Sequence, residues 1–232
     1  MQGLLCTAYG TAPTLEIGEL DERVLAADEV RISVGAVGIG YFDWVLLSGT
    51  YQERPALPFA IGREFSGRII EVGAAVDPGA LGKMVACIGY NGACVERAIA
   101  LEAHCIYLPE GFDAVNGACV PSAYTTALFA LMDCGKLLKG ERVLILGAAG
   151  TVGTAAIHIA LALGGRPIAV ASSQEKRDHC IANGAEFTID GSDPMWRKTL
   201  ADAVERSIWW LIWLADQCRK WRFAASHPAD AT

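Results

Sequence analysis

Residues 141–165 read "ERVLILGAAGTVGTAAIHIALALGG", and this stretch decides the fold. The apolar run within residues 142–146 predicts a short buried strand, and the apolar segment that ends at two consecutive glycines predicts a helix. Between them stand Gly147, Gly150 and Gly153, at the spacing G-x-x-G-x-x-G. A glycine turn that follows a strand and opens a helix is typical of a dinucleotide-binding site.

The glycine turn suits a pyrophosphate because small residues permit a tight turn and let backbone N–H groups approach the anion at a helix N-terminus. Gly153 would also let the helix pack closely on the strand. The alternative is an ordinary structural turn, but the strand and helix around it favour nucleotide binding. The predicted cofactor-binding residues of the turn are Gly147, Ala148, Ala149, Gly150, Thr151, Val152 and Gly153.

The end of the next strand indicates which dinucleotide binds. Residues 167–171, "PIAVA", predict that strand, and a carboxylate at its end would bind the ribose 2′-hydroxyl of NAD. Here Ser172 and Ser173 follow instead, and Lys176 and Arg177 come one turn later. Hydroxyls and cations suit a 2′-phosphate, so the sequence favours NADPH. The alternative is that Ser173 only caps a helix whose solvated face carries the two cations.

The segments around the glycine turn alternate between helix and strand, which predicts a doubly wound parallel sheet. The further elements expected are helices over 121–137, 173–183 and 193–205 and a strand over 186–190. Asp193 is expected to cap the last helix, with Pro194 at its first position. The apolar face of the first of these helices is expected to comprise Ala127, Leu128, Leu131 and Met132.

The first 120 residues have a different pattern, in which short runs of β-formers are separated by glycine and proline. Helical periodicity is scarce there, so this half is expected to form a small β barrel or sandwich. The runs that predict strands are "EVRISVGAVGI", "GRIIEVGAAV", "GKMVACIGY" and "CVERAIAL".

Composition excludes several classes of partner. The net charge of −7 argues against nucleic acid and anionic membranes. No stretch reaches the roughly 20 apolar residues needed to span a bilayer, and no secretory signal is evident, so a cytoplasmic protein is expected. The eight cysteines form no C-x-x-C pair, and the spacing of Cys87, Cys94 and Cys105 fits no zinc knuckle. They are expected to be reduced, partly buried thiols.

The motifs "PFAIGREFSGRIIEVG", "VPSAYTTALFAL" and "VLILGAAGTVG" occur in an order that resembles the medium-chain dehydrogenase/reductase superfamily, in its zinc-free quinone oxidoreductase-like branch. The resemblance covers residues 1–206. It implies a mixed α/β chain with a GroES-like barrel over 1–120 and a partial NADP-binding Rossmann domain over 121–206. It also implies a small-molecule acceptor bound in a cleft.

The resemblance implies roles for further residues. Thr126 of "YTTAL" would lie near the nicotinamide, and Ser172, Ser173 and Lys176 would face the 2′-phosphate. The candidate catalytic residues are Tyr41 and Tyr51, from the segments that line the family's substrate cleft, and Arg63. Alternatively, either tyrosine is a core or rim aromatic, and Thr126 bonds within its own helix.

Both zinc sites of the family's metal-dependent members are expected to be absent. Arg63 stands where those members have a histidine ligand, Gly40 stands where they have cysteine, and the four-cysteine loop is missing. The resemblance therefore implies direct hydride transfer from NADPH to a quinone or enone, which depends on orientation and exclusion of water. Two positions depart from the quinone reductases, which usually have Asn at Gly40 and an aromatic residue at Gly191.

Residues 207–232 depart from the family pattern and hold four of the six tryptophans. Three interpretations compete: an interfacial anchor, an unusual core strand, and translation out of frame. A shifted frame constrained by the single tryptophan codon yields a strand, a glycine turn and an amphipathic helix, so the frame change is favoured. It implies a truncated chain, an impaired family-type homodimer and, as the alternative to an active reductase, a non-catalytic dinucleotide-binding fragment.

Overall fold

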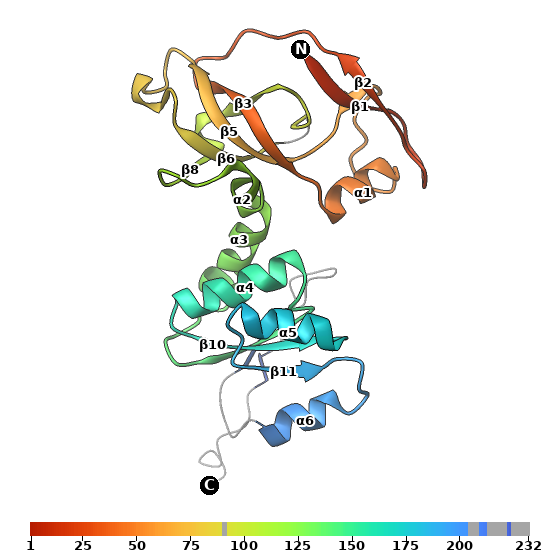
Figure 1. Ribbon diagram of the computed structural model, residues 1–232, viewed down its shortest axis with the longest axis vertical. Helices are drawn as coiled ribbons and strands as arrows, with labels where there is room; N and C mark the ends of the chain where they lie inside the picture. Colours follow the sequence, from red (N-terminus) through yellow and green to blue (C-terminus); the bar gives the residue numbers. More distant parts are fainter. Residues whose placement is uncertain (90–91, 204–208, 213–221, 224–232) are drawn as a thin grey trace. The chain divides into compact units, whose positions relative to one another are not determined.

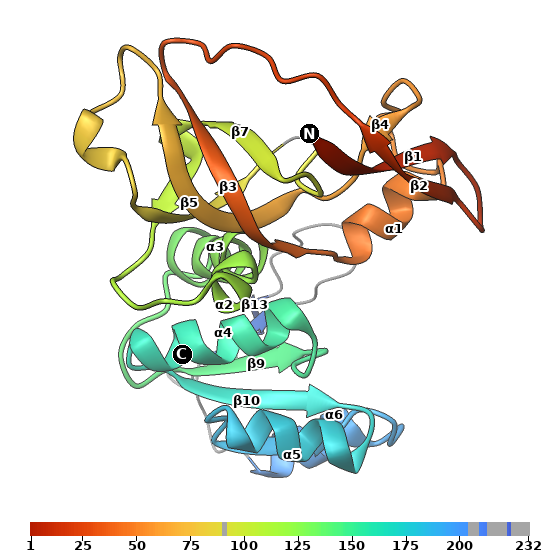
Figure 2. The same ribbon diagram turned by 45° about the horizontal axis from the view of Figure 1, so that its top comes forward.

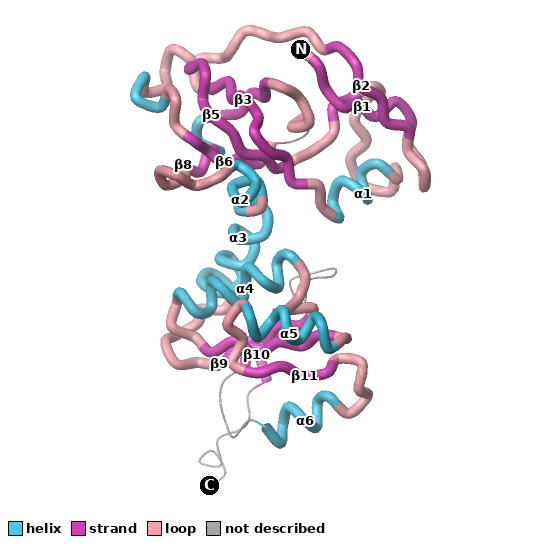
Figure 3. The backbone as a smooth tube through the Cα atoms, viewed as in Figure 1, coloured by secondary structure: helices cyan, strands magenta, loops and turns pink. Residues whose placement is uncertain are grey.

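The computed structural model describes residues 1–89, 92–203, 209–212 and 222–223. The chain divides into two compact units, Met1–Ser122 and Ala123–Thr232 (Figure 1). Strands dominate the first unit, whereas strands and helices alternate in the second (Figure 3). The GroES-like and Rossmann folds that the sequence predicts are both confirmed.

The first unit contains two antiparallel sheets. The smaller has the strand order β2-β1-β4, and the larger has the order β7-β3-β5-β6-β8. The strands are β1 (Gln2–Ala8), β2 (Thr14–Glu19), β3 (Glu29–Gly38), β4 (Phe59–Ala60), β5 (Glu64–Val72), β6 (Met84–Ile88), β7 (Arg97–Leu101) and β8 (Cys105–Tyr107). The helical elements are α1 (Tyr41–Leu47), η1 (Pro78–Ala80), η2 (Glu102–His104) and α2 (Ala114–Ala118).

The core of the larger sheet is built from alternate strand residues. Val30 and Ile32 of β3 are fully buried and pack with Phe65 and Ile69 of β5. Gly67 of β5 lies close against the backbone of β3, since a Cβ there would be 2.1 Å from the carbonyl oxygen of Ser33. Only glycine fits that approach of two backbones.

The second unit is a parallel sheet with the order β11-β10-β9-β12 and a short antiparallel β13 at its edge. Figure 2 shows β9 and β10 side by side beneath α4. The strands are β9 (Arg142–Leu146), β10 (Arg166–Ala171), β11 (Phe187–Asp190), β12 (Trp209–Ile212) and β13 (Arg222–Phe223). The helices are α3 (Val120–Leu128), the π-helical η3 (Phe129–Cys134), α4 (Thr151–Ala162), α5 (Gln174–Ala182) and α6 (Trp196–Ala203).

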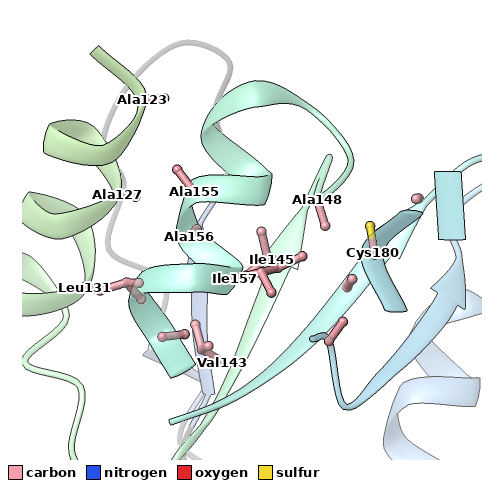
Figure 4. Close-up of a cluster of buried hydrophobic side chains, with 14 of the residues drawn as sticks. Ala123, Ala127, Leu131, Val143, Ile145, Ala148, Ala155, Ala156, Ile157 and Cys180 are labelled. Carbon is pink, nitrogen blue, oxygen red and sulfur yellow. The ribbon is translucent and has the colours of Figure 1, made fainter. Parts of the chain in front are cut away.

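The two faces of this sheet carry separate cores. Side chains of α3, α4 and α5 pack on one face against Val143 and Ile145 (Figure 4). On the other face Leu144 and Ile168 pack with Trp196 of α6. Alternate residues of β9 therefore point to opposite layers, as a doubly wound sheet requires.

Two expectations about helices were wrong, and two short helices were missed. Leu128 and Met132 were expected on the apolar face, but they are exposed, and the buried stripe runs through Ala123, Ala127 and Leu131. The last helix begins at Trp196, because Asp193 to Met195 form a turn whose aspartate accepts the Met195 N–H at 2.8 Å. The short helices α1 and α2 were not expected at all, since each is too short to show a helical period.

The tryptophan-rich segment supplies a strand. Residues Trp209–Ile212 form β12, which pairs in parallel with Arg142–Ile145 of β9. This agrees with the core-strand interpretation for these four residues. The anchor interpretation concerns residues that lie mostly outside the described ones, and the frame-change interpretation stays a prediction about the coding sequence. In the described part of the chain, no helix combines the length and apolar character needed to cross a membrane.

Candidate functional site

The glycine turn after β9 has the backbone geometry that its sequence predicts. Gly147 has φ +64°, a left-handed conformation that side chains disfavour. A Cβ on Gly153 would lie 2.6 Å from both the Ala148 Cα and the Gly147 carbonyl oxygen. Gly153 is therefore what lets α4 start so close to β9.

The first turn of α4 is open to an anion. Gly150 is the N-cap residue and has no side chain that could accept a hydrogen bond from the helix. The first N–H groups of any helix lack partners within the helix, and the helix dipole favours negative charge there. The turn therefore fits a pyrophosphate, which would take these donors without a competing side chain.

The two cations that follow β10, Lys176 and Arg177, differ in their contacts. Arg177 lies 3.0 Å from the Asp190 carboxylate and also donates to the Ala171 carbonyl oxygen at 3.3 Å. Ser173 is the N-cap of α5, where its Oγ accepts the Lys176 N–H at 3.4 Å. The Lys176 side chain is exposed and forms no ion pair among the described residues. Lys176 is therefore the cation available to a 2′-phosphate, with the exposed Ser172 beside it.

A chain of hydrogen bonds that the sequence analysis missed connects α3, α4 and α5. The Tyr124 hydroxyl lies 2.7 Å from His158 Nδ1, and His158 Nε2 lies 2.9 Å from Asn183 Oδ1. The Asn183 amide in turn donates to the His179 carbonyl oxygen at 2.8 Å. These contacts connect the three helices that cover one sheet face. No sequence motif predicts them, because the partners are far apart along the chain.

Thr126 lies on α3 with its side chain exposed, next to the buried Ala127. Its hydroxyl makes no hydrogen bond to another described residue, so the alternative of a bond within its own helix is not what the structure shows. The predicted role near the nicotinamide stays a prediction.

The candidate catalytic residues of the barrel unit do not all come together. The Arg63 guanidinium lies 4.4 Å from the centre of the Phe42 ring, and Tyr51 meets the same ring edge-on at 4.8 Å. Tyr41 instead stacks on Trp44 at 5.7 Å and is 79% exposed. Phe42 thus contacts both Tyr51 and Arg63, whereas Tyr41 contacts Trp44 instead, and the roles of both tyrosines stay predictions.

Two carboxylates accompany Arg63. Asp43 is 4% exposed and accepts the Gly40 N–H at 2.8 Å, and Glu64 accepts the Ser122 N–H at 3.0 Å. Burial raises the pKa of both side chains above the usual range, although these hydrogen bonds and the charge of Arg63 oppose it. The Arg63 Nε atom is buried and has no hydrogen-bond partner among the described residues. Perturbed carboxylates beside an incompletely satisfied arginine are features of functional sites.

Sequence reasoning missed Asp43 and Glu64. Asp43 follows Gly40 at capping-box spacing, which signals a helix start and not a buried charge. Glu64 directly follows Arg63, and nothing in the surrounding sequence signals that its carboxylate is half-buried. Within the described residues, no group of three or more histidine, cysteine, aspartate or glutamate side chains is placed to hold a metal ion.

Comparisons with known proteins agree with this architecture. The family model of the alcohol dehydrogenase GroES-like domain matches residues 26–161. Quinone oxidoreductase-like protein 2 of Mus musculus is 32% identical over 203 residues, which cover 87% of this chain and 56% of that protein. The chain thus spans about half the length of this relative.

Solved structures give the same result. The quinone oxidoreductase of Thermus thermophilus, which was also solved in complex with NADPH, superposes with a TM-score of 0.75 at 30% identity. The match covers 87% of this chain and 64% of that one. The enoyl reductase CurK superposes with a TM-score of 0.79 at 25% identity, over 87% of this chain and 63% of that one.

Proposed function

This chain belongs to the quinone oxidoreductase-like branch of the medium-chain dehydrogenase/reductase superfamily, and on that premise we propose that it is an NADPH-dependent oxidoreductase. The acceptor of the hydride is a quinone or another electron-poor carbonyl or enone, and the reaction needs no zinc. The observation that carries the proposal is the open N-terminus of α4 after a glycine turn in which Gly153 admits no side chain.

Residues of the second unit bind and orient the cofactor. The backbone from Gly147 to Gly153 would hold the pyrophosphate, and Lys176 would pair with the 2′-phosphate, with Ser172 and Ser173 as hydroxyl partners. Thr126 would contact the nicotinamide. Bound NADPH supplies the hydride, so the protein has to fix its position and keep water away from it.

Residues of the barrel unit contact the acceptor in this proposal. The guanidinium of Arg63 would donate to the oxygen on which negative charge develops, and this would give its buried, unpartnered Nε–H group an acceptor. The Phe42 ring contacts both the Arg63 guanidinium and the Tyr51 ring, so the three form one positioned group. Tyr41, which is exposed, would take part only in acceptor selection.

A second candidate is a protein that binds the dinucleotide without turnover. It is favoured by Gly40, which stands where the quinone reductases usually have Asn. The two candidates share the cofactor site and differ only in hydride transfer.

The experiment that tests the proposal combines binding and turnover. NADPH is titrated into the full chain by calorimetry, and NADPH oxidation is then followed by absorbance with 1,4-benzoquinone as the acceptor. Binding with turnover that falls in Arg63→Ala supports the reductase, and binding without turnover supports the second candidate. No saturable NADPH binding contradicts both.

A further inference from the structure

Cys87 and Cys105 form a close cross-strand pair in the barrel unit. They are directly opposite each other in the antiparallel ladder of β6 and β8, and their Sγ atoms lie 3.3 Å apart. Neighbouring pairs, Val85 with Tyr107 and Ala86 with Ile106, fix this register. The sequence predicts that both are reduced, partly buried thiols, and their spacing fits no zinc knuckle.

The positions of the two residues suit a covalent bond. Directly opposed residues of an antiparallel pair have Cα atoms about 4.5–5.5 Å apart, and this lies within the range of natural disulfides. The sulfur atoms would have to approach by about 1.2 Å to reach the disulfide bond length. β8 is the edge strand of its sheet and pairs with β6 alone, so it has room to make this small adjustment.

The two thiols differ in a way that assigns them separate roles. Cys87 is completely buried, whereas Cys105 is partly exposed. The Cys87 thiol donates its hydrogen bond to Cys105 Sγ, which lowers the pKa of Cys105, although burial and the Glu102 carboxylate oppose this. The same hydrogen bond, together with burial, raises the pKa of Cys87. In its protonated form Cys105 can donate to the Leu101 carbonyl oxygen at 3.5 Å.

We propose that Cys87 and Cys105 are a peroxide-reactive pair that forms a reversible cross-strand disulfide, with Cys105 as the thiol that the peroxide oxidises first. This site is independent of the proposed reductase activity. The other buried cysteines of the described chain, Cys6 and Cys180, have no second thiol within hydrogen-bonding distance.

The chemistry proceeds in two balanced steps. The Cys105 thiolate attacks the terminal oxygen of a hydroperoxide ROOH, and the O–O bond breaks, so that Cys105 becomes a sulfenic acid. The alkoxide RO⁻ takes up the proton that the Cys105 thiol released and leaves as ROH. The Cys87 sulfur then attacks the Cys105 sulfur, the S–O bond breaks, and the hydroxyl leaves as water with the Cys87 proton. Overall, two thiols lose two hydrogens and ROOH is reduced to ROH and water. A dithiol reductant reverses the result by thiol–disulfide exchange.

The test treats the full chain with a small excess of hydrogen peroxide, alkylates the remaining thiols, and identifies modified peptides by mass spectrometry. We expect a peptide that links Cys87 to Cys105, formed at least about tenfold faster than oxidation of the exposed Cys119 and removed by dithiothreitol. Cys119→Ser is the matched control and should leave the linked peptide unchanged.

Two variants separate the steps. Cys105→Ser should abolish the link, and Cys87→Ser should leave a sulfenic acid on Cys105 that dimedone captures. Circular dichroism checks that each variant is folded. If either variant does not fold, the wild-type peptide map decides by itself. Oxidation of Cys119 ahead of the pair, or accumulation of sulfinic acid on Cys105 without a link, would overturn the proposal.

Discussion

At the scale of single residues, we predict that Lys176 determines the choice between the two nicotinamide cofactors. Two cations follow β10, and the Asp190 carboxylate pairs with Arg177. Lys176 pairs with no carboxylate among the described residues. We expect Lys176→Ala to weaken NADPH binding about tenfold, which corresponds to one charge-assisted hydrogen bond of roughly 1.4 kcal/mol, and to leave NADH binding unchanged. Titration calorimetry with both cofactors measures the ratio.

The matched control is Lys198→Ala, which removes an exposed lysine of α6. This variant should not alter the preference for NADPH over NADH. An unchanged preference in Lys176→Ala as well would show that the two hydroxyls alone, or no residue at this strand end, select the cofactor.

Gly153 is a second residue whose effect can be stated. In Gly153→Ala the new Cβ would lie 2.6 Å from backbone atoms of Gly147 and Ala148, so helix α4 would have to move. We expect a loss of about 1–3 kcal/mol in the free energy of unfolding, measured in urea. Gly150→Ala is the control from the same turn. Its Cβ would lie 3.3 Å from one carbonyl oxygen at φ −78°, so it should cost clearly less. Equal costs would contradict the close packing of α4 on β9.

The residues of the site were predictable from the sequence to unequal degrees. The glycine turn was, because strand, spacing and helix all signal one backbone geometry. The pairing of Arg177 with Asp190 and the burial of Asp43 were not, since both depend on side chains brought together from different elements. The contact of Cys87 with Cys105 was hidden for the same reason, as it needs the register of β6 against β8.

At the scale of elements, Glu29 ties the loop before β3 to the start of that strand. Its carboxylate accepts two hydrogen bonds from Arg23, at 2.6 and 2.7 Å, and one from the Ala26 N–H at 2.8 Å. The bonds from Arg23, helped by the Ala26 N–H, lower the pKa of Glu29 to about 2 from 4.5. A carboxylate with a lowered folded pKa binds fewer protons folded than unfolded, so its stabilisation is present above pH 4.5 and is lost as the pH falls to about 2.

We therefore expect Glu29→Gln to reduce the free energy of unfolding by up to about 1 kcal/mol at neutral pH, since Arg23 is 59% exposed and solvent screens the pair. The difference between variant and wild type should shrink as the pH falls from 4.5 towards 2. Urea unfolding at pH 7 and pH 3 measures it. Glu110→Gln, at an exposed position, is the control and should show no such trend. A difference that stays constant with pH would contradict the role of the ionised carboxylate.

Periodicity predicted most elements of the second unit, because apolar strands and a glycine-terminated helix leave strong patterns. It failed where tertiary structure decides. The buried stripe of α3 follows Ala123 and Ala127 and continues to Leu131 of η3, and the small alanines let α3 approach Ala155 and Ala156 of α4 (Figure 4). Hydrophobicity alone predicts that the larger Leu128 and Met132 also lie on the buried face. The parallel pairing of Trp209–Ile212 with β9 was only one of three interpretations, since a continuous apolar run fits several environments.

At the scale of the whole molecule, the two units have separate cores. The core cluster that contains Phe65 and Ile69 draws all its residues from the barrel unit, and the clusters around Ile145 and Ile168 draw theirs from the second unit. A unit with its own core can unfold as a cooperative unit. The fold class was predictable because each half carries its own pattern.

Separate cores predict two unfolding transitions, of which NADPH shifts one. At a concentration about 100 times its dissociation constant, a ligand adds about 2.7 kcal/mol to the unit that binds it. We expect calorimetry to show that NADPH raises the transition of the second unit and leaves that of the barrel in place. The variants assign the transitions. Gly153→Ala should lower only the transition of the second unit, and Glu29→Gln should lower only the transition of the barrel. A single transition that NADPH and both variants shift together would mean that the two cores unfold as one, and the cofactor would then stabilise the barrel as much as the sheet that binds it.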